Sequence, residues 1–231
     1  MSTLIKKTWL FLTVTALAVS LGACSQDKAI DLAQGDWASH EFHNQVVSFI
    51  IEEGYDKSTD ITTADTPVVT QSLRTGDLEV NVEMWSDNVE TYEEDLENNE
   101  YHEISVNFDD NAQGFYIPAY LQEENPGLES IQDLPDYKHL FPHPEETNWD
   151  PEEDKAIIYG GPSGFAATGF LQNKFDNEED YGELIANYDF WPLESTATLN
   201  TTLTDAYENE DPWVGYNWEP TWIMGLYDMV L

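Results

Sequence analysis

Hydrophobic and polar positions along this chain follow two different periods. From Leu78 to Met84, apolar residues alternate with polar ones, which is typical of a strand with one buried face. The stretch from Val214 to Trp218 alternates in the same way and is rich in strand-forming residues. Residues 27–34 are expected to hold a short tether and the first strand, and further strands are expected over residues 78–85, 104–108, 115–120, 156–159, 184–190 and 214–218.

The second period is that of a helix. Phe42, Val46, Phe49 and Ile50 recur every three or four residues and predict one apolar helix face that packs on a core. Ser39 is the expected N-cap of this helix. Helices are predicted over residues 39–54, 66–75, 87–97, 130–134, 165–175 and 195–208. The alternation of strands and helices predicts the α/β fold class with mainly parallel sheets.

The first 24 residues have the pattern of an export signal. Lys6 and Lys7 precede an apolar run over residues 8–21, and small residues lead to Cys24. This pattern resembles a bacterial lipoprotein signal, in which the cysteine becomes the lipidated first residue. The alternative is an ordinary cleaved secretory signal. Cys24 is the only cysteine, so an intrachain disulfide is excluded.

The charge of the chain is extreme. Forty-six acidic residues against 8 Lys and Arg give a formal net charge of −38. Nucleic acids and anionic lipid surfaces repel such a chain, so neither is expected as a partner. Aromatic residues make up 13% of the sequence, which argues against disorder. A solvated acidic surface of this kind stays soluble in concentrated salt, and we hypothesise a salty habitat.

Four aromatic residues stand out by their positions. Trp37 lies in a turn before a predicted helix, Trp85 ends a predicted strand, Tyr116 begins one, and Trp218 lies in an aromatic stretch closed by Pro220. Turns after parallel strands gather at one sheet edge, where open α/β sheets bind ligands. Aromatic rings converging there would form a cage for a quaternary ammonium group. The alternative is that these rings are dispersed in the core and at its rim.

Five short motifs stand out along the chain: Gly35-Asp36-Trp37, Val82-Glu83-Met84-Trp85, Gly114-Phe115-Tyr116-Ile117-Pro118, Ile158-Tyr159-Gly160-Gly161-Pro162-Ser163-Gly164 and Tyr216-Asn217-Trp218-Glu219-Pro220-Thr221-Trp222. Together they resemble one family, the substrate-binding proteins of ABC importers for glycine betaine, proline betaine and choline. The similarity runs from about Gln34 to Leu231 in the order and spacing of that family.

This resemblance implies a two-lobed fold of the type II periplasmic-binding-protein kind that closes on its ligand. Residues 25–113 would form the first lobe and residues 114–213 the second. Residues 214–231 would return to the first lobe. Members of the family usually continue further, so the chain is expected to be C-terminally truncated, with a first lobe that lacks its usual last helices.

The resemblance also implies site residues. Trp37, Trp85, Tyr116 and Trp218 match the cage positions of the family. Choline-binding members have an Asp where this chain has Ser39, and a hydroxyl there favours a betaine carboxylate over choline. The neighbouring His40 is a second candidate donor to that carboxylate, or else an exposed residue of the first helical turn. Backbone N–H groups at Gly161 and Ser163 are further candidates, or that loop is simply a tight turn.

The function that follows is capture of a quaternary ammonium osmolyte outside the cytoplasm and its delivery to an ABC permease and its ATPase. Such a protein performs no chemistry. No Ser-His-Asp, metal-ligand or phosphate-loop motif occurs, so no catalytic residue, metal ion or cofactor is expected. Two alternatives remain: a secreted sugar-binding or carbohydrate-active protein, because exposed Trp rings also stack on sugars, and a non-binding truncated paralogue.

Overall fold

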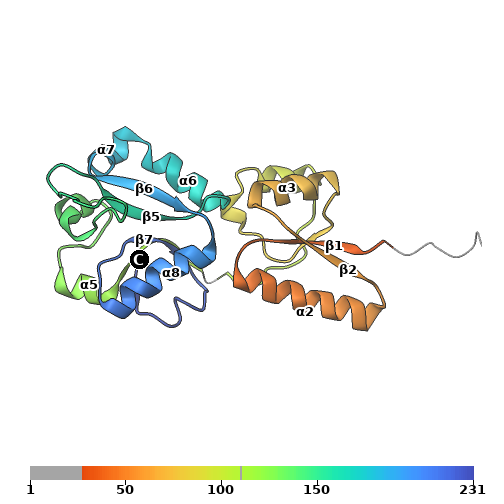
Figure 1. Ribbon diagram of the computed structural model, residues 1–231. Helices are drawn as coiled ribbons and strands as arrows, with labels where there is room; N and C mark the ends of the chain where they lie inside the picture. The colour runs from red at the N-terminus through yellow and green to blue at the C-terminus, as the bar shows by residue number, and fades with distance from the viewer. Residues whose placement is uncertain (1–27, 110) are drawn as a thin grey trace, which may run out of the picture.

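The computed structural model describes residues 28–109 and 111–231, which form two α/β lobes side by side (Figure 1). Cys24, the predicted lipidation site, lies outside the described residues. The first lobe consists of β1 (Ile30–Gln34), α2 (Ala38–Tyr55), β2 (Thr59–Thr63), α3 (Thr66–Thr75), β3 (Val80–Asn81), the 3-10 helix η1 (Ser86–Asn88) and α4 (Tyr92–Glu97).

The second lobe follows from Gln113 onward. It consists of β4 (Gln113–Pro118), α5 (Ala119–Glu124), the 3-10 helix η2 (Leu134–Leu140), β5 (Ala156–Pro162), α6 (Ala166–Phe175), α7 (Glu178–Asn187), β6 (Tyr188–Leu193), α8 (Thr196–Asn209), β7 (Gly215–Trp218) and β8 (Met229–Val230). The α/β class predicted from the sequence is therefore confirmed.

Each lobe is built on its own sheet. In the first, the strand order is β2-β1-β3 and both pairs are parallel. Leu32 of the central strand β1 lies opposite Ile61 of β2 on one side and Val80 of β3 on the other. Helices α2 and α3 lie on opposite sides of this sheet (Figure 1). In the second, the order is β6-β5-β7-β4-β8. Strand β5 runs parallel to β6 and β7, whereas β4 runs antiparallel to β7 and β8.

The expectation that residues 214–231 return to the first lobe is wrong for β7 and β8. Both strands pair with β4 in the second sheet. Between them, Ile223 is 1% exposed and packs in the same core as Trp213 and Trp218. Burial of these large apolar side chains holds the segment in the second lobe.

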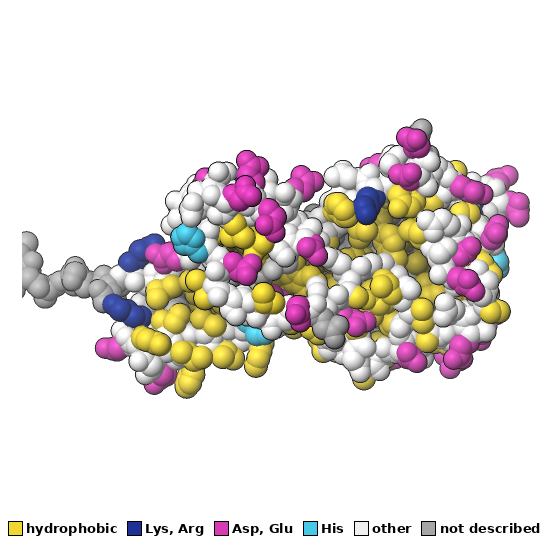
Figure 2. All heavy atoms as spheres, turned by 180° about the vertical axis from the view of Figure 1, so that it is seen from behind, with side chains coloured by type: hydrophobic (Ala, Val, Ile, Leu, Met, Phe, Trp, Pro, Cys, Tyr) yellow, Lys and Arg dark blue, Asp and Glu magenta, His cyan; other side chains and the backbone are white. Residues whose placement is uncertain are grey.

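Helix α2 does not pack through the face that the sequence predicted. Its buried residues are His40 and Asn44, and the Asn44 side-chain amide donates to the Ala33 carbonyl at 2.8 Å. Phe49, which the apolar pattern assigned to the core, is 66% exposed. The other residues of the same face, Phe42, Val46 and Ile50, are 42–65% exposed. Figure 2 shows apolar side chains gathered on this part of the first lobe, at the lower left of the view.

Three strand predictions also differ from the structure. The strand over residues 78–85 is reduced to Val80–Asn81. Residues 104–108 form no strand, and Ile104 is 93% exposed. In place of a strand over residues 184–190, α7 continues to Asn187 before β6 begins.

Candidate ligand-binding site

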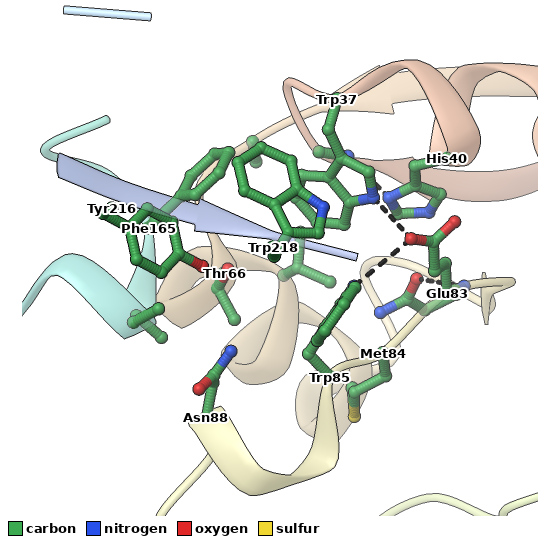
Figure 3. Close-up of a pocket in the computed structure, with 16 residues that line it drawn as sticks. Trp37, His40, Thr66, Glu83, Met84, Trp85, Asn88, Phe165, Tyr216 and Trp218 are labelled. Carbon is green, nitrogen blue, oxygen red and sulfur yellow. Dashed lines mark hydrogen bonds between the residues drawn. The ribbon is translucent and has the colours of Figure 1, made fainter. Parts of the chain in front are cut away.

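A pocket lies where the two lobes meet (Figure 3). Direct contacts join the lobes beside it: the Thr196 backbone N–H donates to the Asp36 carboxylate at 3.1 Å, and the Thr196 hydroxyl donates to the Asp36 carbonyl. The first lobe contributes Gly35, Trp37, His40, Ala64, Thr66, Val69, Asn81, Glu83, Met84, Trp85 and Asn88 to the lining. The second lobe contributes Phe165, Ala166, Ala167, Tyr216 and Trp218.

Three indole rings reach this pocket from separate parts of the chain. Trp37 is the N-cap residue of α2, Trp85 precedes η1, and Trp218 is the last residue of β7. Two further rings extend the aromatic wall: Phe165 meets Trp37 edge-on at 5.4 Å between ring centroids, and Tyr216 stacks on Trp218 at 5.7 Å. The structure therefore brings together three of the four predicted cage residues.

Glu83 connects two of these indoles. Its Oε1 accepts from the Trp37 Nε1–H at 2.7 Å and from the Trp85 Nε1–H at 3.2 Å, as the dashed lines in Figure 3 show. The Ser39 hydroxyl donates to the same oxygen at 2.9 Å, and His43 Nδ1 lies 2.9 Å from Oε2. Because Glu83 is only 4% exposed, these bonds fix the orientation of both rings in a buried setting.

His40 lines the same pocket and is 1% exposed. Its Nδ1 accepts from the Gly35 backbone N–H at 2.9 Å, so the neutral imidazole carries its proton on Nε2. Burial lowers the pKa of His40 to about 4, with nearby Glu83 opposing the shift and His43 adding to it. Nε2 has no hydrogen-bond partner. The backbone of Ala33 and the side chain of Asn81 slightly raise the pKa of His40 and so oppose the effect of burial.

Ser39 and Tyr116, two predicted site residues, are not among the residues that line the pocket. Helix α2 begins at Ala38, so Ser39 is not the N-cap, and its hydroxyl is engaged by Glu83. Tyr116 is 2% exposed in the core of the second lobe. Burial, reinforced by Glu219, raises the pKa of Tyr116 to about 12.

Gly161 and Ser163 also lie outside the lining. The Ser163 N–H donates to the Leu193 carbonyl at 3.0 Å and is therefore already occupied. A Cβ at Gly161 would lie 2.7 Å from the Tyr216 ring, so this glycine makes room for a ring that does line the pocket.

Sequence reasoning predicted Trp37, His40, Trp85 and Trp218 among the lining residues and missed the others, including Glu83, Phe165 and Tyr216. Tyr216 lies two residues before Trp218 in β7, and the two-residue period of a strand places both on one face. That spacing was a usable signal. Phe165 carried no comparable signal, because it was expected only as the first residue of a helix.

In residues 28–109 and 111–231, no group of three His, Cys, Asp or Glu side chains is arranged to hold a metal ion. Over those same ranges no helix combines the length and apolar character needed to cross a bilayer.

Two α/β lobes with a pocket at their junction define the architecture of two-lobed solute-binding proteins. The family model described as "Substrate binding domain of ABC-type glycine betaine transport system" (OpuAC) matches residues 28–231. The chain therefore belongs to the OpuAC family of ABC-transporter substrate-binding domains. A search of curated protein sequences gave no match.

Solved structures with the same fold carry related descriptions. The glycine betaine, L-proline-binding protein ProX from Borrelia burgdorferi is 18% identical with a TM-score of 0.69, and the match covers 88% of this chain and 68% of ProX. Lactococcal OpuAC complexed with glycine betaine is 19% identical with a TM-score of 0.57, covering 88% and 70%. An ABC-transporter choline-binding protein in complex with choline is 15% identical with a TM-score of 0.66, covering 87% and 63%.

Proposed function

We propose that this chain captures a quaternary ammonium solute, glycine betaine or a similar osmolyte, between its lobes and delivers it to an ABC permease. One observation carries the proposal: Trp37, Trp85 and Trp218 come from distant parts of the sequence and line a single pocket. Indole faces attract a cation electrostatically, and a methylated ammonium has no N–H that must be hydrogen-bonded. Each ring contributes about 0.5–2 kcal/mol, so several are needed for useful affinity.

Titration calorimetry with glycine betaine, choline and a maltodextrin tests this proposal. We expect a quaternary amine to bind and the maltodextrin not to bind. The double variant Trp85→Ala, Trp218→Ala is expected to lose binding while circular dichroism shows that it stays folded. Trp222→Ala is the matched control, because Trp222 is 56% exposed and does not line the pocket. Normal affinity in the double variant would refute the cage, and binding of the maltodextrin alone would favour the sugar-binding alternative.

We also propose that the mature protein is tethered to the outer face of the cytoplasmic membrane through a lipid on Cys24. The signal-like pattern of residues 1–24 supports this part of the proposal. Expression in a bacterial host with a labelled fatty acid tests it. Label and membrane association are expected in the wild-type chain and not in Cys24→Ala, and an unlabelled wild-type chain would argue for an ordinary secretory signal.

A further inference from the structure

Two contacts join the lobes beside the pocket without lining it. One pairs Asp36 of the first lobe with Thr196 of the second, and the other brings Asp65 of the first lobe against Gly164 of the second. In each contact the acid is the direct sequence neighbour of residues that do line the pocket. Thr196 and Gly164 lie at the starts of α8 and α6, which face the first lobe (Figure 1).

The contact between Asp36 and Thr196 completes the first turn of α8. The first N–H groups of a helix have no partner within it. The Ser195 hydroxyl accepts from the Thr198 N–H, and the Asp36 carboxylate, from the other lobe, accepts from the Thr196 N–H at 3.1 Å. The Thr196 hydroxyl also donates to the Asp36 carbonyl. A negative charge is stabilising at a helix N-terminus, so this pair favours the arrangement in which the lobes touch.

The contact between Asp65 and Gly164 depends on the absence of a side chain. A Cβ at Gly164 would overlap the Asp65 carboxylate. In residues 28–109 and 111–231, Gly76 is the only glycine with a positive φ, so the backbone at Gly164 accepts other residues. Asp65 is the N-cap residue of α3, but its side chain makes no capping hydrogen bond. The close approach of the first lobe therefore requires glycine at this position.

The pocket is complete only while the lobes touch, because both contribute to its lining. A ligand that contacts both lobes selects this arrangement. Its apparent dissociation constant is the intrinsic one divided by the fraction of molecules that adopt the arrangement. A contact made only between the lobes raises that fraction without touching the ligand. Its loss therefore weakens binding by the factor by which the fraction falls.

We propose that Asp36, Thr196, Asp65 and Gly164 are positioning residues for ligand capture, which set the affinity of the pocket by holding the lobes together. This inference rests on the proposed function, because it concerns the same pocket. It gives Asp36 and Asp65 a role that differs from that of the other surface acids, since each faces the opposite lobe.

Stopped-flow fluorescence of the full chain tests the first contact, with glycine betaine or choline as the probe, whichever binds the wild type more tightly. Asp36→Ala and Thr196→Val should each weaken affinity about three- to tenfold. The loss should appear as faster dissociation, with the association rate constant changed by less than about twofold, because the ligand arrives before the lobes come together. Thr201→Val, at an exposed position of the same helix, is the matched control. Normal affinity in both variants, or a loss confined to association, would overturn the role of this contact.

A second substitution that reverses the effect of the first tests the other contact. Gly164→Ala should weaken affinity about tenfold or more, and adding Asp65→Ala should restore it to within about threefold of the wild type, because the shorter side chain makes room for the new methyl group. Gly169→Ala is the matched control, since a Cβ there meets nothing within 4 Å. A double variant as weak as Gly164→Ala alone would contradict a contact between the lobes as the cause.

A measurement without ligand separates this inference from the function on which it rests. If no quaternary amine binds the wild type, the proposed function fails, but the contacts can still be tested by small-angle X-ray scattering. Gly164→Ala should have a larger radius of gyration than the wild type and Gly169→Ala, and adding Asp65→Ala should reverse the change. Equal radii in all four chains would overturn the inference.

Discussion

Replacement of His40 should change how the free energy of unfolding depends on pH, because this imidazole is buried in the first lobe. The imidazole is 1% exposed, and burial lowers its pKa to about 4 from an ordinary value of 6.5. The titratable groups that face it are Glu83, which opposes this shift, and His43, which adds to it. His40→Asn keeps an acceptor for the Gly35 N–H and removes the titration.

The direction of this pH effect follows from proton binding in the folded and unfolded chains. Between pH 6.5 and about pH 4 the unfolded chain binds a proton at His40 that the folded chain does not, so the free energy of unfolding decreases as the pH falls through this window. The contribution of His40 is fully present above pH 6.5. On lowering the pH from about 7.5 to about 5, the wild type should lose about 2 kcal/mol through this residue, and His40→Asn should not.

Urea unfolding followed by circular dichroism at the two pH values gives the free energies for both chains. The many carboxylates titrate in both, so only the difference between wild type and variant reports on His40. His102→Asn, at an exposed position, is the control. Identical pH slopes in the wild type and His40→Asn would refute the reasoning. If the variant does not fold, NMR titration of the wild-type imidazole serves instead, and a midpoint near 6.5 would contradict burial in the neutral form.

Three further predictions concern packing and charge. Phe49→Ala should change the free energy of unfolding by less than about 0.5 kcal/mol, because the ring is 66% exposed. Leu203→Ala, at a position with 0% exposure, should lower it by about 2–5 kcal/mol. Equal losses in the two variants would contradict the exposed face of α2. Gly161→Ala should lower the free energy of unfolding by about 1–3 kcal/mol and weaken ligand affinity measured by calorimetry. The reason is that its Cβ would lie 2.6 Å from Thr168 Oγ1 and 2.7 Å from the Tyr216 ring. Unchanged stability and affinity would contradict this reasoning. With a net charge of −38, the unfolding midpoint should rise with NaCl concentration, and full stability in dilute buffer would count against a salt-adapted surface.

Features governed by local rules could be predicted from the sequence. Pro67 near the start and Gly76 after the end predicted α3, and the structure has that helix over Thr66–Thr75 with Gly76 in the left-handed conformation. For α3 the signal lies within a few residues of the feature. The meeting of Trp37, Trp85 and Trp218 in one pocket was different: their places beside turns and strand ends left two interpretations open, and only the resemblance to the importer family favoured a shared site.

Features that depend on distant partners could not be predicted in this way. The spacing of Phe42 and Phe49 correctly shows that one side of α2 is apolar, but it does not show whether another element covers that side. In the structure the sheet contacts the His40 and Asn44 side instead, where Asn44 bonds to the backbone of β1. A periodic pattern therefore defines a face of a helix, whereas tertiary structure decides which face is buried.

Glu83 shows the same principle at the site itself. Its place between Val82 and Met84 in an alternating run predicts a side chain on the solvated face of a strand. The strand ends at Asn81, however, and the carboxylate turns inward to accept from an indole 46 residues earlier in the chain. Among 46 acids no local pattern distinguishes it from the rest, because its burial depends on donors supplied by another segment. The burial of Glu83 is thus a property of the assembled lobe, because the groups that compensate its carboxylate come from other segments of the chain.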